Sequence, residues 1–236
     1  MPFNEGDFVL VNYTLRIKGT GEVVDTTDPD IARKAGIYDE GKRYGPRLVV
    51  IGEGRLIKGL EKAIREMNVG EKKTVEIPPE EAYGKRDPSK VKILPRSYFT
   101  RQGIRPEPGR MVDIGGRTGI IRSVTGGRVV VDFNHPLAGK TLEAEIEVVK
   151  KVDEVPEKVK LLLLRRLPPR IEEDEVEVEY KAESKEAIVK LPGKIIDVPD
   201  AQLVKRIVVD EVARYIPEIE DMEFRERVHV APPSKK

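Results

Sequence analysis

Hydrophobic and polar residues alternate along residues 7–17, which read DFVLVNYTLRI. The positions that share one face are Val9, Val11, Tyr13, Leu15 and Ile17. A period of two residues predicts a half-buried β-strand. A glycine-rich turn then leads to a second short strand that ends at Asp25. Residues 26–46 are polar and carry Asp, Gly and Pro, so we expect a long surface loop with one helical turn near residues 30–36.

The next segment changes from a strand to an amphipathic helix. Residues 47–54, RLVVIGEG, predict a strand that is closed by two glycines. In LIKGLEKAIREMNVGE, residues 56–71, apolar residues recur at helical spacing and Gly70 ends the helix. These apolar positions are Ile57, Leu60, Ile64 and Met67. A single amphipathic helix among strands is expected to lie across a sheet, to which residues 74–77 add a further strand.

Residues 92–133 have a different sequence pattern from the segments before them. Four short apolar segments, VKILP, RMVDI, TGIIRSV and RVVVDF, are separated by Gly and Pro and predict a small all-β unit. An alternating strand then resumes, with glutamates on one face and apolar residues on the other. The apolar face consists of Leu142, Ala144, Ile146 and Val148.

The last third of the chain has its own pattern of elements. A helix that ends at Pro168, two strands, a second helix and a final strand give the order αββαβ, which predicts a separate α+β domain. Asp200 is the expected N-cap of the second helix, whose apolar residues are Leu203, Ile207, Val208 and Val212. The segment KLLLLRRL has more aliphatic residues than one helix face needs. This surplus favours a helix that is buried on two sides or at a dimer interface.

Composition narrows the functional classes. The chain has 236 residues, no Cys and only two His, which excludes a disulfide framework and argues against a multi-His zinc site. Lys and Arg number 43 against 42 Asp and Glu, and this balance argues against a general nucleic-acid binder. No signal peptide or membrane-spanning run is visible. We therefore expect a cytoplasmic protein that needs no metal or other cofactor and does not bind a membrane.

Four motifs occur together in a fixed order. VNYTLRIKGTGEVVDTT, LIKGLEKAIREMNVGE and IPPEEAYG are followed, after the β-rich segment, by DFNHPLAGKTL. Over about residues 3–151 the chain resembles FKBP-type peptidyl-prolyl cis-trans isomerases. It is most similar to the SlyD-like subclass and its long archaeal members, which carry a chaperone domain inserted in the flap.

The resemblance implies a fold and a division into domains. The fold class is α+β: an FKBP antiparallel sheet wrapped on one helix, a small all-β insert in the flap, and a separate C-terminal α+β domain. The FKBP domain would comprise residues 1–86 and 133–152, the insert residues 87–132, and the C-terminal domain residues 153–236. Separately, the aliphatic surplus of the C-terminal domain leads us to expect that it pairs two chains or offers additional client surface.

The resemblance also assigns a site. Tyr13 and Asp25 would pair beside the substrate amide, and the Ile57 N–H and the Tyr83 hydroxyl would each bind a substrate carbonyl. The wall and floor would consist of Val24, Val49, Leu56, Leu60 and Ala144. From the residues alone, a core tyrosine and a turn-capping aspartate remain alternatives for the Tyr13–Asp25 pair.

Three positions depart from the best-known relatives. Leu60 replaces an aromatic floor, while Ala144 and Arg47 stand at positions that are frequently aromatic. We therefore expect a wider or shallower pocket and modest activity on short peptides. His135, in NHPLAG, is expected to be a junction residue that hydrogen-bonds locally, with a metal or proton-transfer role as the alternative.

The function implied is a prolyl isomerase and folding chaperone that acts on unfolded or partly folded polypeptides containing X-Pro bonds. An amide that is twisted midway has lost resonance and should favour a dry apolar pocket, so no nucleophile or titrating base is needed. The alternative is a holdase with a weak or vestigial prolyl site, in which the insert alone binds clients.

Overall fold

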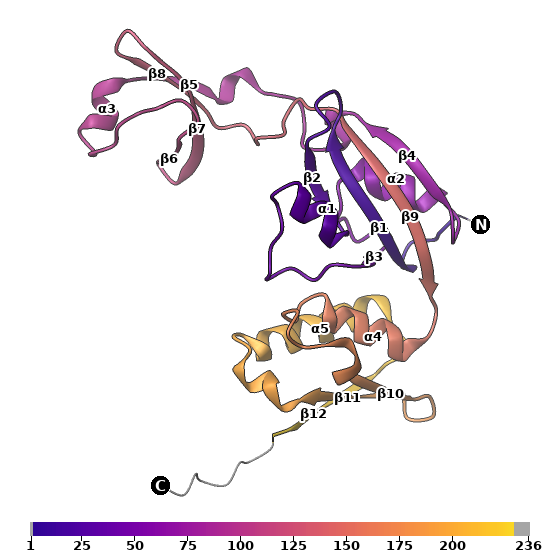
Figure 1. Cartoon of the computed structure of the whole chain (residues 1–236). Helices are drawn as coiled ribbons and strands as arrows, with labels where there is room; N and C mark the ends of the chain where they lie inside the picture. Colours follow the sequence, from indigo (N-terminus) through magenta and orange to yellow (C-terminus); the bar gives the residue numbers. More distant parts are fainter. Residues whose placement is uncertain (1, 229–236) are drawn as a thin grey trace, which may run out of the picture. The chain divides into compact units, whose positions relative to one another are not determined.

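The computed structural model describes residues 2–228, and these divide into two compact units. The major unit consists of the chain up to Glu76 and from Glu143 onward, and the insert unit is Ile77–Leu142. The described residues include no helix long and apolar enough to cross a membrane. Figure 1 shows the elements of each unit with the labels used below.

The first sheet of the major unit has five strands. Its order is β2-β1-β9-β4, and β3 pairs with β1. The β1–β2 and β1–β3 pairs are antiparallel. The strands are β1 (Phe8–Ile17), β2 (Val23–Thr26), β3 (Arg47–Val50), β4 (Lys72–Ile77) and β9 (Leu142–Val152). The alternating burial of β9, whose Leu142, Ala144, Ile146 and Val148 are all buried, confirms the period-two prediction.

Two helices accompany this sheet. The short α1 (Pro29–Lys34) is capped by the Asp28 carboxylate and confirms the helical turn expected in the loop. The longer α2 (Lys58–Glu66) buries Leu60 and Ile64. The helix therefore packs its expected apolar face into the core.

The C-terminal part of the major unit contains a second, three-stranded sheet of order β10-β11-β12. β10 pairs antiparallel with β11, while β12 pairs parallel with β11. Figure 1 shows α4 and α5 on the same side of this sheet. The elements are α4 (Val155–Leu164), η3 (Glu173–Glu175), β10 (Glu177–Lys181), β11 (Glu186–Pro192), η4 (Gly193–Asp197), α5 (Ala201–Tyr215) and β12 (Asp221–Arg227). The predicted αββαβ order is confirmed, with two short 3₁₀ turns added.

The aliphatic surplus of α4 is used inside one chain. One continuous core joins Phe8 and Val50 of the first sheet to Leu162 and Leu163 of α4 and to Val208 of α5. The helix is therefore buried on two sides, as one of the two sequence interpretations expected, and its surplus needs no second chain.

One expectation for α5 was wrong. Leu203 is 54% exposed, because Val204, Val208 and Val212, spaced four residues apart, form the inward stripe and leave Leu203 beside it. Asp200 is the N-cap residue of α5, as expected, but its side chain accepts no capping hydrogen bond and its backbone is left-handed, with φ of 58°. A left-handed backbone there differs from the extended geometry that an N-cap side chain requires.

The insert unit contains a four-stranded antiparallel sheet of order β5-β8-β7-β6. Its strands are β5 (Val91–Pro95), β6 (Met111–Ile114), β7 (Arg117–Thr125) and β8 (Arg128–Asp132), with 3₁₀ turns η1 (Pro79–Glu81) and η2 (Pro88–Lys90) before them. All four predicted strands are present. The sequence did not predict α3 (Arg96–Thr100), because a five-residue helix is too short to show a period. It carries the fully buried Phe99 into the core of the unit.

Candidate active site

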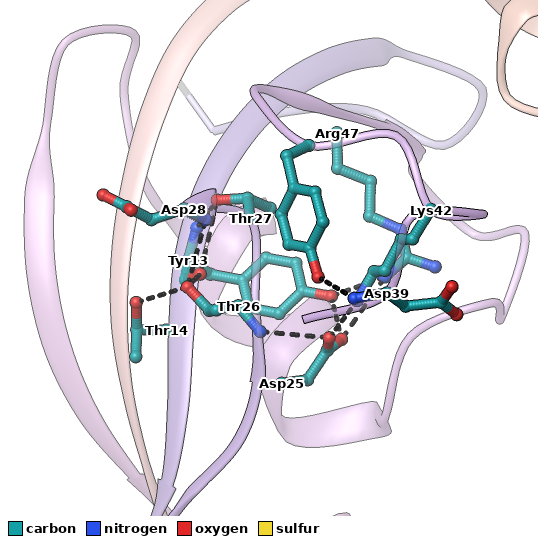
Figure 2. A network of polar contacts seen from close by, with 10 residues as sticks. Tyr13, Thr14, Asp25, Thr26, Thr27, Asp28, Asp39, Lys42 and Arg47 are labelled. Atoms are coloured by element: carbon teal, nitrogen blue, oxygen red, sulfur yellow. Dashed lines mark hydrogen bonds and ion pairs between the residues drawn. The ribbon is translucent and has the colours of Figure 1, made fainter. Parts of the chain in front are cut away.

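The candidate site of the major unit begins with a hydrogen bond between neighbouring strands. In the antiparallel register of β1 and β2, Leu15 is the residue opposite Asp25. Tyr13 is two residues before Leu15 on β1, so it is a diagonal neighbour of Asp25 on the adjacent strand. The Tyr13 hydroxyl donates to Asp25 Oδ2 over 2.5 Å, and the Tyr13 side chain is almost fully buried. Figure 2 shows the two side chains meeting inside a larger polar network. The pairing that the resemblance implies for these residues is thus observed.

Two cations complete this network. Lys42 Nζ forms an ion pair with Asp25 Oδ1. Arg47 Nη1 donates to the Tyr13 hydroxyl over 2.5 Å and lies 3.4 Å from Asp25 Oδ2. From the sequence, Arg47 was noted only as standing at a frequently aromatic position. Lys42 was not predicted to belong to the site, because it lies in an irregular loop without a hydrophobic period. Both cations make the rim of the site more polar than an aromatic wall would.

The charge states in this network follow from its contacts. Burial opposes ionisation of Asp25, but hydrogen bonds from Lys42 and Tyr13 outweigh it and hold the pKa of Asp25 below its ordinary value. Burial raises the pKa of Tyr13 well above its usual range; Arg47 opposes this rise and Asp25 reinforces it. Asp25 is therefore a carboxylate and Tyr13 a neutral phenol throughout the physiological range.

Three buried threonines fix the backbone around the pair. The Thr14 and Thr26 hydroxyls share a hydrogen bond of 2.9 Å, and Thr27 Oγ1 accepts from the Tyr13 N–H over 3.0 Å. Asp25 Oδ1 also accepts from the N–H of Thr26. The carboxylate thus caps its own turn and pairs with Tyr13 at once, so the two sequence interpretations of Asp25 are compatible.

The Ile57 segment offers an unused backbone donor. Ile57 is the N-cap residue of α2, and its carbonyl accepts from Leu60 and Glu61. Its own N–H donates no hydrogen bond within residues 2–228. The segment is held by Glu61, whose Oε1 accepts from the Gly52 N–H over 2.7 Å. A backbone donor at the start of a helix can bind a ligand carbonyl.

The expected wall residues differ in accessibility. Val24 and Leu56 are half-buried, whereas Leu60 and Val49 retain only 2% and 5% exposure. Ala144 has no accessible surface, so in this conformation it supports its neighbours from behind and does not present a face to a ligand.

Tyr83 belongs to the insert unit, where its ring stacks on His135. The ring centroids lie 4.3 Å apart and the planes are 1° from parallel. His135 Nδ1 accepts from the Leu137 N–H over 3.2 Å, which is the local hydrogen bond expected of a junction residue. The described residues contain no group of three metal-ligating side chains.

Three protein-family models match the chain. The model described as FKBP-type peptidyl-prolyl cis-trans isomerase matches residues 2–100. Those described as FKBP26, IF domain and FKBP26_C-terminal match residues 92–137 and 155–229. Three of the four short motifs on which the resemblance rested lie inside the match at residues 2–100, and the fourth, at residues 132–142, begins inside the match at residues 92–137.

Relatives with similar sequences agree with these matches. A short-type peptidyl-prolyl cis-trans isomerase of Methanocaldococcus jannaschii is 40% identical over 144 residues, which are 61% of this chain and 90% of the relative. An FKBP-type 16 kDa peptidyl-prolyl cis-trans isomerase of Escherichia coli K12 is 33% identical over 147 residues, 60% of this chain and 89% of the relative. The SlyD isomerase of Helicobacter pylori is also 33% identical over 147 residues, 59% of this chain and 70% of the relative. This chain belongs to the FKBP-type peptidyl-prolyl cis-trans isomerases and carries the insert-in-flap and C-terminal domains of the FKBP26 group.

Proposed function

We propose that isomerisation of X-Pro bonds takes place at the Tyr13–Asp25 pair, with Ile57 and Tyr83 as donors to the substrate backbone. The polar network around Asp25 carries the proposal, because the buried Tyr13 phenol and the half-buried Asp25 carboxylate are fixed by contacts on both sides. Val24, Val49, Leu56, Leu60 and Ala144 form or support the apolar wall in this proposal. The substrates are polypeptides, and we propose unfolded or partly folded clients in particular.

The chemistry is a rotation. An X-Pro amide has a barrier of about 18–20 kcal/mol, since rotation must break amide resonance. Tyr13 is neutral, Asp25 is ionised and Lys42 and Arg47 neutralise that carboxylate, so the network presents fixed dipoles and no group poised to titrate. Donors at Ile57 N and the Tyr83 hydroxyl would hold the flanking carbonyls while the bond turns. Stabilisation of the twisted amide by a preorganised site lowers the barrier without a covalent intermediate.

A direct test compares site variants with matched controls on an X-Pro tetrapeptide. We expect Asp25→Ala and Tyr83→Phe to lower kcat/KM by about 10- to 100-fold, the range expected when a hydrogen bond to a charged or reacting group is lost. Asp197→Ala and Tyr215→Phe make the same chemical changes in the C-terminal sheet domain and should keep the wild-type rate. Equal rates in all four variants would place the site elsewhere.

We also propose that the insert unit binds client chains. Ile93 on β5 is 64% exposed and Met111 on β6 is 66% exposed. These two strands are the outer strands of the sheet order β5-β8-β7-β6, so each offers a free edge to an extended segment. Client binding by the insert unit would add a capture site to the isomerase. The same binding would also suffice for the alternative function, a holdase with a weak prolyl site.

Aggregation assays separate these alternatives. The pair Ile93→Ser and Met111→Ser should weaken the suppression of client aggregation, and Tyr83→Phe should leave that suppression intact. The exposed Val69→Ser, outside the insert unit and 54% exposed, is the control for loss of surface apolar area. If the insert pair suppresses aggregation as well as the wild type does, the insert is not the capture site.

The remaining parts of the proposal concern cellular setting and assembly. We propose a cytoplasmic enzyme whose partners do not include nucleic acid or membranes, since 43 basic residues balance 42 acidic ones. We also propose that two chains pair through the C-terminal domain, where Leu203 and Val209 of α5 remain exposed. Sedimentation equilibrium decides this: one mass at the monomer value over the micromolar range would refute the dimer.

A further inference from the structure

A short turn, residues 39–44, lies beside the candidate prolyl site and is held in shape by its own contacts. The Asp39 carbonyl accepts from the Lys42 N–H over 3.1 Å, and the Asp39 N–H donates to the Tyr44 hydroxyl over 3.1 Å. The Tyr44 ring stacks on that of Tyr38, with the centroids 5.0 Å apart. These contacts join close neighbours in the chain. They fix the shape of the 39–44 turn, and its direction relative to the site depends on other contacts.

One such contact joins the 39–44 turn to the site. Lys42 Nζ forms an ion pair with Asp25 Oδ1, and Figure 2 shows the two side chains meeting. Arg47, which lies near the other carboxylate oxygen, belongs to β3 and pairs with Val11 of β1. A strand pairing therefore fixes the backbone of Arg47, whereas Lys42 belongs to no strand and depends on the turn.

Arg43 joins the same turn to the C-terminal domain. Its Nε donates to the Leu164 carbonyl over 3.3 Å. Its Nη2 donates to the carbonyls of Pro168 and Ile171, over 3.3 and 2.6 Å. Glu173 adds an electrostatic attraction. The last carbonyls of a helix have no partner inside the helix, so the end of α4 and the loop after it are well suited to hold a guanidinium.

The two contacts are made by consecutive residues. Lys42 reaches the prolyl site and Arg43 reaches the C-terminal domain, so a backbone shift at one residue moves the other. A lysine side chain is flexible, and forming an ion pair costs it rotamer freedom. A backbone that is already fixed at Arg43 lowers this cost and favours the pair between Lys42 and Asp25.

We propose that Arg43 is a positioning residue of the prolyl site, which anchors the 39–44 turn to the C-terminal domain and thereby keeps Lys42 on the Asp25 carboxylate. The C-terminal domain then supports isomerisation without touching the substrate. This inference rests on the proposed prolyl site and extends it to a domain that lies outside the catalytic residues. Loss of Arg43 should release the turn and leave Asp25 less firmly held beside Tyr13.

A double-mutant cycle tests whether Arg43 acts through Lys42. Exchange NMR on an X-Pro tetrapeptide gives kcat and KM for Arg43→Ala, Lys42→Met and the double variant. We expect each single change to lower kcat about three- to tenfold with little change in KM, because the donors at Ile57 and Tyr83 remain. The double variant should be no slower than Lys42→Met alone, since the effect of Arg43 needs Lys42.

The titration of Asp25 provides a readout that needs no catalysis. Burial opposes ionisation of this carboxyl, and its contacts with Lys42, Tyr13 and Arg47 outweigh burial and lower its pKa. Arg43→Ala should therefore raise the pKa of Asp25, in the same direction as Lys42→Met. Carbon-13 NMR of the carboxyl carbon measures this shift in the folded protein.

Three further variants serve as controls. Arg43→Lys keeps a cation with three donors and should retain most of the wild-type kcat and Asp25 titration. Arg170→Ala removes another arginine of the C-terminal domain that donates to a backbone carbonyl, that of Asp197, and should change neither readout. Arg43→Gln, which keeps an amide donor, replaces Arg43→Ala if circular dichroism shows that the alanine variant is unfolded.

The outcomes separate the two proposals. The positioning role would be overturned if Arg43→Ala left the titration of Asp25 and kcat unchanged, or if the double variant were slower than Lys42→Met by the full factor of Arg43→Ala. If the titration shifts as expected but neither Lys42→Met nor Asp25→Ala slows isomerisation, the proposed prolyl site is wrong, and the anchoring of Lys42 by Arg43 stands.

Discussion

Arg165 joins the two sheet domains of the major unit through a nearly buried ion cluster, which predicts a large loss of stability when it is removed. Arg165 lies on the C-terminal side of α4, and its guanidinium makes two 2.8 Å hydrogen bonds to Glu53, beside β3. A further contact of 2.7 Å reaches Glu211 of α5. The three side chains are only 10–11% exposed.

The size of the effect follows from what remains after Arg165→Ala. Removing one partner of a buried pair costs about 3–5 kcal/mol, because the other charge is left buried. Glu211 keeps its contact with Arg166, but Glu53 keeps only Arg55 at 3.8 Å. We therefore expect the lower end, about 3 kcal/mol of unfolding free energy, and a fall in Tm of roughly 6–12 °C.

Urea unfolding followed by circular dichroism measures this loss without adding the ionic strength of a guanidinium salt. Arg225→Ala is the control, since its pair with Glu223 is exposed and should contribute less than about 0.5 kcal/mol. The double variant Arg165→Ala with Glu53→Ala should show a coupling free energy above roughly 1 kcal/mol. A loss below about 1 kcal/mol for Arg165→Ala would refute the claim that this cluster fastens the two domains.

Two further predictions concern the insert unit. A Cβ at Gly119 would lie 2.7 Å from Val131 Cγ1 and 2.9 Å from the Phe133 ring, so Gly119→Ala should destabilise the insert unit by about 1–3 kcal/mol. Hydrogen exchange should show this as an earlier loss of amide protection in the insert unit, and unchanged protection would contradict the prediction. His135→Ala removes the ring stacked on Tyr83, an interaction worth about 0.5–1.5 kcal/mol, and should lower kcat/KM on a tetrapeptide roughly two- to tenfold. His135→Phe keeps a ring at this position and should retain most of the wild-type kcat/KM. Equal rates for the Ala and Phe variants would show that the stack does not position Tyr83.

Local patterns were sufficient wherever a structural feature repeats along the chain. The alternation through Val9 and Leu15 predicted β1, and the helical spacing of Leu60 and Ile64 predicted α2. Both are decided by which side chains enter the core, which the sequence shows directly.

Local sequence patterns could not predict contacts between residues that are far apart in the chain. Arg165 and Glu53 are 112 positions apart, and nothing in either local sequence marks a partner. Lys42 lies in an irregular loop, so its pairing with Asp25 depends on a path that no period encodes. The exposure of Leu203 shows the same limit on a smaller scale, since the phase of α5 was set by the surface on which it packs.

The central claim is that the prolyl site acts through fixed charges and without proton transfer. Asp25, with its lowered pKa, stays ionised until the solution becomes more acidic than its ordinary value of 3.8, and Tyr13, with its raised pKa, stays protonated into strongly alkaline solution. The most direct test is kcat/KM for an X-Pro tetrapeptide, measured by exchange NMR from about pH 5 to about pH 9 in H₂O and D₂O, between the ordinary titrations of Asp and Tyr. The account predicts a flat profile and a solvent isotope ratio near one. A bell-shaped profile, or a clear slowing in D₂O, would show that a proton moves in the catalysed step and would contradict it.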